Sequence, residues 1–128
     1  MLSTVVPIQG TFDIAKGRNS LRTHIAVQHW PATFGAHASA LLTALGELIL
    51  SSGEGYLVPV QMFFEDGDDA AGIRFVCAIP MYNIDSNKFQ DIISRLERAS
   101  DTIDIKEDGV RLHIAVGLWI NSRSASAC

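Results

Sequence analysis

Apolar residues recur at helical spacing in three stretches of the chain. Between Phe34 and Ile49 they stand three or four positions apart, which is the spacing of an amphipathic helix. The same spacing predicts a helix from Asp13, taken as its N-cap, to about Gln28, and a third helix that begins at Ser86. The residues expected to face the core are Ile14, Leu21 and Ile25 in the first helix, Phe34, Ala38, Leu41, Leu42, Leu45, Leu48 and Ile49 in the second, and Phe89, Ile92, Ile93 and Leu96 in the third.

Alternating apolar residues and turn residues predict five strands, over about residues 3–9, 56–65, 72–80, 102–106 and 110–120. Pro59 favours an edge strand or a bulge, and "EDG" predicts a hairpin between the last two strands. The order β-α-α-β-β-α-β-β predicts an α/β (α+β) two-layer sandwich, with three helices on one face of a mixed sheet. We expect one domain over residues 1–120 and a flexible tail over 121–128, because "SRSASAC" is of low complexity.

Composition narrows the classes of function. Hydrophobic residues make up 48% of the 128 residues, which is typical of a globular domain. The net charge of −4 gives no positive field for a phosphate backbone, so nucleic acid is not an expected partner. The start of the chain lacks the pattern of a signal peptide, and we expect no segment that crosses a membrane. Two cysteines make no disulfide framework, and these features together predict a cytoplasmic protein.

Three segments carry a resemblance to a known family. They are "TFDIAKGR", "ALLTALGELILSSGEGYLVPVQ" and "DIISRLERASDTIDIKEDGVRLHIAVGLW". Their pattern of hydrophobic positions resembles the histidine-kinase-like (GHKL) ATPase fold, and more narrowly the small bacterial anti-sigma-factor and switch serine kinases. The resemblance implies that the first segment opens the first helix, that the second covers the second helix and the following strand, and that the third closes the domain.

The family's second helix carries a Glu-x-x-x-Asn motif. There the acid helps to activate or orient the attacking group, and the asparagine holds the magnesium ion that bridges the phosphates. In this chain Glu47 fits the acid position, but Ser51 stands where the asparagine should be. Both are interpreted as vestiges of a catalytic helix, against the simpler interpretation of Glu47 as a solvated surface acid.

The adenine-binding motif of the family, Asp-x-Gly-x-Gly, is also replaced. Ile79 stands at the aspartate, Met81 at the first glycine and Asn83 at the second. A hydrocarbon at Ile79 offers no hydrogen bond to adenine, and a site built for a polar partner discriminates strongly against its loss. Only "MYNID" separates this strand from the next helix, where the family has a glycine-rich lid. We therefore expect no nucleotide cofactor and no metal, with ATP and magnesium as the alternative.

Arg18 and Arg22 lie four positions apart and so share one face of the first helix. In the resembled kinases an arginine near the start of this helix contacts the partner, and Arg18 aligns best with it. Guanidinium groups suit carboxylates on an acidic partner. Together with Leu50, predicted to point outward, they form the expected partner-binding surface, although a plain solvated face would show the same pattern.

Other sites find little support. His24 and His29 are five positions apart, which does not stack them on one helix face, and no further zinc ligands can be identified. "FFEDGDD" lacks the spacing of a calcium loop and is interpreted as a solvated hairpin turn.

The leading hypothesis is a degenerate relative of the switch kinases that does not bind ATP. It would act as a regulatory protein–protein interaction module that docks on a STAS-type antagonist, a sigma factor or a histidine-kinase partner, with homodimerisation as a further use of its surface. The alternative is a divergent ATP-dependent serine/threonine kinase that uses Glu47 and Ser51. A structural subunit with a superficial likeness to the fold is the third hypothesis.

Overall fold

The computed structural model describes residues 2–52, 57–66, 71–80 and 86–120. These residues form three helices and five strands in the predicted order. The elements are β1 (Leu2–Ile8), α1 (Thr11–Val27), α2 (Ala32–Ser52), β2 (Val58–Asp66), β3 (Ala71–Pro80), α3 (Ser86–Ala99), β4 (Thr102–Glu107) and β5 (Arg111–Trp119). The expected tail, 121–128, and the residues Met81 and Asn83 lie outside the described residues.

The strands form one five-stranded sheet in the order β1-β2-β3-β5-β4. All four neighbouring pairs are antiparallel, so the expectation of a mixed sheet is wrong. The reason lies in the connections. The chain reverses three times between β1 and β2, on entering α1, between α1 and α2, and on leaving α2, which makes these neighbours antiparallel. The single helix α3 returns β4 in the same direction as β3, but β5 lies between the two strands.

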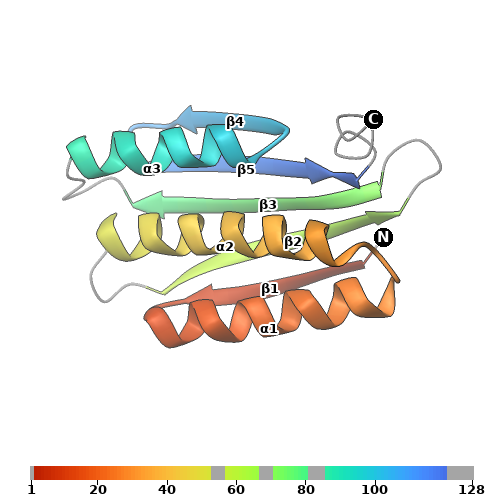
Figure 1. Ribbon diagram of the computed structural model, residues 1–128. Coiled ribbons are helices and arrows are strands. Elements are labelled where there is room, and N and C mark those ends of the chain that lie inside the picture. Colours follow the sequence, from red (N-terminus) through yellow and green to blue (C-terminus); the bar gives the residue numbers. More distant parts are fainter. Residues whose placement is uncertain (1, 53–56, 67–70, 81–85, 121–128) are drawn as a thin grey trace.

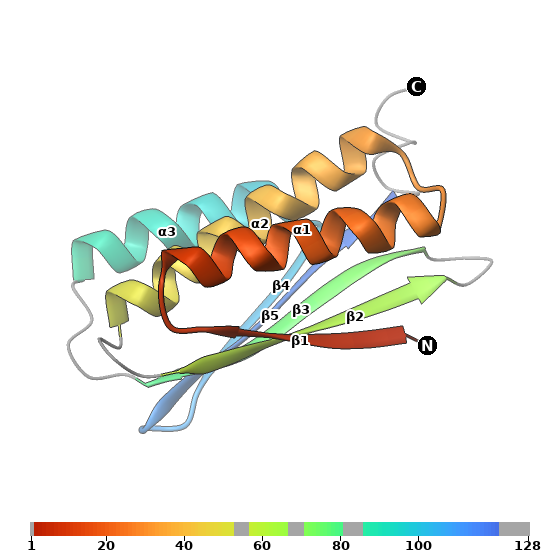
Figure 2. The same ribbon diagram turned by 90° about the horizontal axis from the view of Figure 1, so that it is seen from below.

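The helices cover one face of the sheet, as predicted. α1, α2 and α3 lie side by side in one layer, with α2 in the middle (Figure 1), and the sheet forms the second layer beneath them (Figure 2). The inward-facing residues expected for α1 and α2 are all buried, and so are Ile92, Ile93 and Leu96 of α3. Phe89 is partly buried and packs against the same core. The helical spacing therefore identified the core faces of the helices correctly.

The start of α1 differs from the prediction. Gly10, not Asp13, is the N-cap residue, with extended backbone angles. The Asp13 carboxylate reaches back and accepts hydrogen bonds from the N–H groups of Gly10, at 3.1 Å, and Gln9, at 2.8 Å. An acidic residue near the start of a helix can bind the free N–H groups either as the N-cap residue itself or from the N3 position, three residues later. The sequence pattern alone did not distinguish these two positions for Asp13.

Pro59 lies in an interior strand whose register with β1 is one to one, so neither the edge strand nor the bulge expected there occurs. β2 runs between β1 and β3. However, the pairing of β2 with β3 begins only at Gln61, so at Pro59 the strand has β1 as its one neighbour. The missing N–H of proline therefore interrupts no hydrogen bond to β3.

Helix α2 contains a 20-residue segment, Ala32–Ser51, that is long and apolar enough to cross a membrane by length and composition. The sequence led us to expect no membrane-crossing segment, and length and composition alone do not overturn that expectation. In the fold, 61% of the segment is buried, against the sheet and both neighbouring helices. Such burial is typical of a helix packed in a domain core, and it accounts for the apolar composition.

The predicted hairpin joins β4 to β5, and Asp108 organises its turn. The carboxylate accepts hydrogen bonds from the N–H groups of Val110 and Arg111, at 2.9 and 2.7 Å, and lies 2.8 Å from Nε2 of His113. The hydrogen bond with His113, followed by those with the backbone, lowers the pKa of Asp108 well below its ordinary value. Gly109 has a φ angle of 91°, a conformation that glycine adopts most easily.

Candidate functional site

Glu47, at the expected position of the catalytic acid, is held in an ion pair between two helices. Its Oε2 accepts a hydrogen bond from Nη1 of Arg95 on α3 at 2.7 Å. This hydrogen bond is the largest cause that raises the pKa of Arg95 above its ordinary value. The side chains of Arg95 and Glu47 are 39% and 43% exposed, so the pair stabilises the fold by only about 0.2–1 kcal/mol. The ion pair also connects α2 to α3 and so helps to hold the two helices in place.

Ser51 and Leu50 follow Glu47 at the end of α2. The hydroxyl of Ser51 donates to the carbonyl oxygen of Glu47 at 2.7 Å, a common bond for serine within a helix. Leu50, expected to point outward, is instead partly buried and packs against the hydrophobic core. The reason is the place of α2 between α1 and α3, which covers more of its circumference than a helix at the edge of the layer would have covered (Figure 1).

Ile79, at the expected position of the adenine-binding aspartate, is completely buried. It lies in β3 opposite Leu112 of β5 and belongs to the same hydrophobic core as the helices. Met81 and Asn83, the other two positions of that motif, fall outside the described residues. In the described part of the chain, the positions that the resemblance assigned to the nucleotide site thus contact other protein groups: Glu47 an arginine, Ser51 the helix backbone, and Ile79 the core.

A cavity of about 770 Å³ lies on the outer side of the helix layer. Its floor is formed by small residues of α2, including Gly35, Ala36, Ala40 and Thr43. α1 forms one side and Arg95 of α3 lies at the other. We call this cavity the trough. From Ala32 to Thr43 it follows α2 for roughly 17 Å, at about 1.5 Å per residue.

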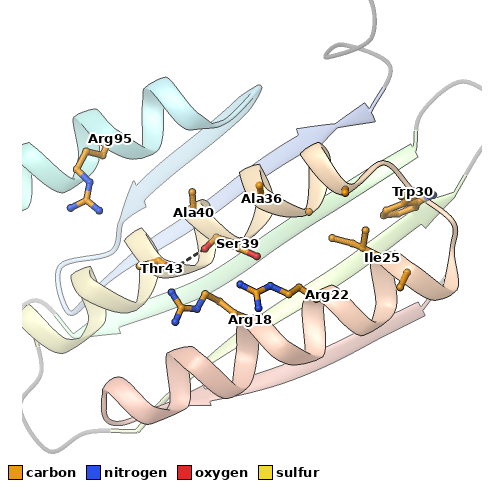
Figure 3. A pocket seen from close by; sticks show the side chains of 12 residues that line it. Arg18, Arg22, Ile25, Trp30, Ala36, Ser39, Ala40, Thr43 and Arg95 are labelled. Atoms are coloured by element: carbon orange, nitrogen blue, oxygen red, sulfur yellow. Dashed lines mark hydrogen bonds between the residues drawn. The ribbon is translucent and has the colours of Figure 1, made fainter.

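Arg18 and Arg22 extend from α1 into the trough. Figure 3 shows both guanidinium groups directed across the gap toward α2. Arg18 is half-buried and Arg22 is exposed. Neither forms an ion pair with an acidic residue in the described part of the chain, whereas Arg95 is paired with Glu47. The structure therefore brings the two arginines predicted from the sequence to one cavity, and it separates them from Leu50.

Ser39 is a buried polar residue at the floor of the trough. It is 8% exposed, and its Oγ finds no hydrogen-bond partner among the described residues. Figure 3 shows this hydroxyl directed from α2 toward α1, while its backbone oxygen accepts a bond from the Thr43 hydroxyl at 2.8 Å. A buried hydroxyl without a hydrogen-bond partner lowers the stability of a fold by about 1–3 kcal/mol. Such unpaired groups are uncommon in native proteins.

Trp30 closes one end of the trough, and the turn before it determines its place. After α1, the N–H groups of His29 and Trp30 donate to the carbonyls of Ala26 and Ile25, both at 3.1 Å. This is a Schellman motif, in which His29 adopts a φ angle of 59° where glycine is most common. The Trp30 ring then packs edge-on against Phe34, with 5.6 Å between the ring centroids.

No group of three or more His, Cys, Asp or Glu residues that could hold a metal ion occurs within the described residues. His24 packs its ring against Phe64, and His113 is bonded to Asp108. Cys77 is buried in β3, and its burial raises the pKa of its thiol to about 12. A thiol in this state is a packing residue and not a nucleophile.

No protein-family model matches the chain, and no curated protein is significantly similar to it. The family expected from the hydrophobic pattern therefore stays a prediction. The candidate site rests on the geometry of the trough and of the residues around Glu47.

Sequence reasoning missed two features of the site. The pairing of Glu47 with Arg95 joins residues 48 positions apart, and no local pattern shows it. The floor of the trough does have a local signal: Ala32, Ala36 and Ala40 recur at intervals of four, which places small side chains on one face of the helix.

Proposed function

We propose that the protein is a regulatory protein–protein interaction module of the cytoplasm that does not use ATP. Its expected partner is an acidic surface on another regulatory protein, such as a STAS-type antagonist, a sigma factor or a histidine-kinase partner. Helix α1 supplies the contact through Arg18 and Arg22. The resemblance to the switch kinases motivates the choice of partners.

One observation carries the proposal: Arg18 and Arg22 converge on a cavity at the surface without an acidic partner among the described residues. A guanidinium group presents a planar set of donors that matches a carboxylate, so two such groups at one cavity favour an acidic ligand. Small residues on α2 also let a partner's backbone approach closely. These features support recognition of another protein's acidic segment.

The residues at the nucleotide positions support the absence of ATP chemistry. The carboxylate of Glu47 is engaged by Arg95, and the Ser51 hydroxyl by the helix backbone. Ile79 is buried with other apolar side chains. A nucleotide bound in the manner of the family would need Glu47 to leave its ion pair and an acid in place of Ile79.

A binding assay with a partner tests the role of α1. Proteins that co-purify with the chain from its host would be identified, expressed and titrated against the purified domain. We expect Arg18→Glu to weaken binding at least tenfold, because it replaces attraction to the partner's carboxylates with repulsion. Lys16→Glu is the matched control, since it makes the same change of charge on α1 outside the trough. Equal binding by both variants would contradict the proposed contact.

The alternative is a divergent ATP-dependent serine/threonine kinase. One observation favours it: Glu47 occupies the expected position of the acid and is 43% exposed, so it could be reached by a substrate. Thermal unfolding with ATP and magnesium separates the two functions. A ligand at a hundred times its Kd stabilises by about 2.7 kcal/mol, which shifts Tm by several degrees, and the interaction module should show no such shift.

Homodimerisation belongs to the same proposal. The helices cover one face of the sheet (Figure 2). Val76, Ala78 and Ala115, which alternate with the buried core residues of β3 and β5 and so belong to the other face, are half-buried. This face offers a moderately apolar surface to a second copy. Sedimentation equilibrium over a range of protein concentrations would measure self-association, and a monomer at all concentrations would remove this part of the proposal.

A further inference from the structure

We infer that the trough is also a binding site for a small organic acid: an oxyanion attached to an apolar body. Nothing in the resemblance to the kinases places a ligand on the outer side of the helix layer. The inference goes beyond the proposed function and does not depend on it, because it concerns the trough in the isolated domain.

The charge of the ligand follows from the arginines. Arg18 and Arg22 enter the trough from one side, and they stand one helical turn apart on α1. No acidic residue in the described part of the chain pairs with either. The third arginine, Arg95, already has Glu47 as its counter-charge. The two unpaired cations therefore match one or two oxyanion groups, for which bidentate guanidinium binding is the strong mode.

The unpaired hydroxyl of Ser39 is a second and independent indication of a ligand. It is more than nine-tenths buried, it lines the trough, and it points toward the same space as the arginines. A native fold seldom keeps such a group without a partner. A hydroxyl can donate or accept, so a carboxylate or carbonyl oxygen of a ligand that displaces the groups covering the Ser39 Oγ would satisfy it.

The apolar body follows from the rest of the lining. Ile25, a core residue, lines the trough, and Ala36 and Ala40 form an apolar floor. Trp30 lies at the end of the trough away from Arg18 (Figure 3). A volume of about 770 Å³ falls within the range of roughly 300–1,000 Å³ found for small-molecule sites. An apolar cavity with a few convergent polar groups is the usual form of such sites.

Bound ligand would use the same guanidinium groups as the proposed partner. A small acid would therefore compete with the partner's carboxylates for Arg18 and Arg22, and its concentration would control complex formation. This coupling is a consequence of the shared arginines and requires no change of fold.

Isothermal titration of the full chain with decanoate, below the concentration at which it forms micelles, tests the inference. We expect saturable binding with one ligand per chain. Decan-1-ol lacks the charge and acetate lacks the apolar body, so each should bind at least tenfold more weakly. Decan-1-ol binding as tightly as decanoate, or no saturable binding of decanoate, would overturn the inference.

Variants locate the binding. The double change Arg18→Gln with Arg22→Gln should weaken decanoate binding about tenfold or more, because each charge-assisted bond contributes strongly. Ala40→Leu should weaken it severalfold by narrowing the trough, and this exposed position can take a larger side chain without entering the core. Lys16→Gln, on α1 outside the trough, should leave the affinity unchanged. Unchanged affinity in both trough variants would refute the site.

Ser39→Ala gives a readout that a purely structural role would not produce. Removing an unpaired buried hydroxyl should raise Tm of the free protein, and removing a hydrogen bond to the ligand should weaken decanoate binding roughly three- to tenfold. A higher Tm with unchanged affinity would contradict the assignment of Ser39. The partner assay with Arg18→Glu is separate, so failure of decanoate binding leaves the proposed function standing.

Discussion

Replacing Gly46 with alanine should destabilise the domain, although the same change at Gly35 should stabilise it. Both glycines lie in α2, where alanine is favoured over glycine by about 0.5–1 kcal/mol. A β-carbon at Gly35 would meet its nearest atoms, in Ile25, at 3.6 and 3.7 Å, which is ordinary contact. A β-carbon at Gly46 would meet two atoms of Ile14 at 2.6 Å. The two positions therefore differ in the room available for a β-carbon and not in helix preference.

The magnitude follows from this difference. Carbon atoms pack best at about 3.5–4.0 Å, so the contacts at Gly46 are about 1 Å too short. Ile14 is buried and β-branched, and it cannot turn away easily. Overpacking of this kind costs about 1–3 kcal/mol. The difference in the free energy of unfolding between the two variants should be about 1–3 kcal/mol, since the gain in helix preference cancels.

Urea denaturation of the wild type and of both variants measures this difference. The slopes with denaturant should agree, which would show that the unfolded states are comparable. If Gly46→Ala is stabilised as much as Gly35→Ala, then α1 and α2 do not approach each other as closely as described. The shape of the trough between them would then need revision as well.

Three further predictions concern single residues. His29→Gly should stabilise the fold by about 0.5–1 kcal/mol in the same denaturation assay, because glycine adopts a φ angle of 59° without strain. Asp108 has a lowered pKa, so its stabilising contribution is present above its unfolded pKa of about 4 and is lost as the pH falls further toward the folded pKa. Asp108→Asn should therefore lose less stability than the wild type between pH 4 and pH 2, as followed by thermal unfolding at several pH values. A Cys128→Ser variant leaves Cys77 as the one thiol. This thiol should react with a disulfide reagent at pH 8 only after the protein unfolds, because it is buried and its pKa is raised to about 12. Rapid reaction of the folded protein would contradict its burial.

The sequence predicted the elements and the inward faces of the helices because these depend on local spacing. Helices repeat every 3.6 residues, and the positions of Leu41, Leu45 and Leu48 follow that period directly. Strand directions depend on connections between distant elements. For this reason the mixed sheet was predicted wrongly, since nothing near β4 indicates that β5 separates it from β3.

The candidate site was predicted in part. Arg18 and Arg22 share a face of α1 by their spacing, and the structure places both at one cavity. The cavity itself depends on the packing of α1 against α2 and on the position of Arg95 on α3, which no local pattern records. The outward position of Leu50 was predicted from α2 alone, and it failed because two neighbouring helices cover α2.

The central proposal is that Glu47, Ser51 and Ile79 bind no nucleotide and that the trough is the binding surface. Isothermal titration with ATP and magnesium, on the wild type and on Glu47→Gln, tests this claim most directly. The account predicts no magnesium-dependent saturable binding at millimolar ATP in either protein. Magnesium-dependent binding by the wild type that Glu47→Gln abolishes would contradict it, because Glu47 would then act on a nucleotide in addition to pairing with Arg95.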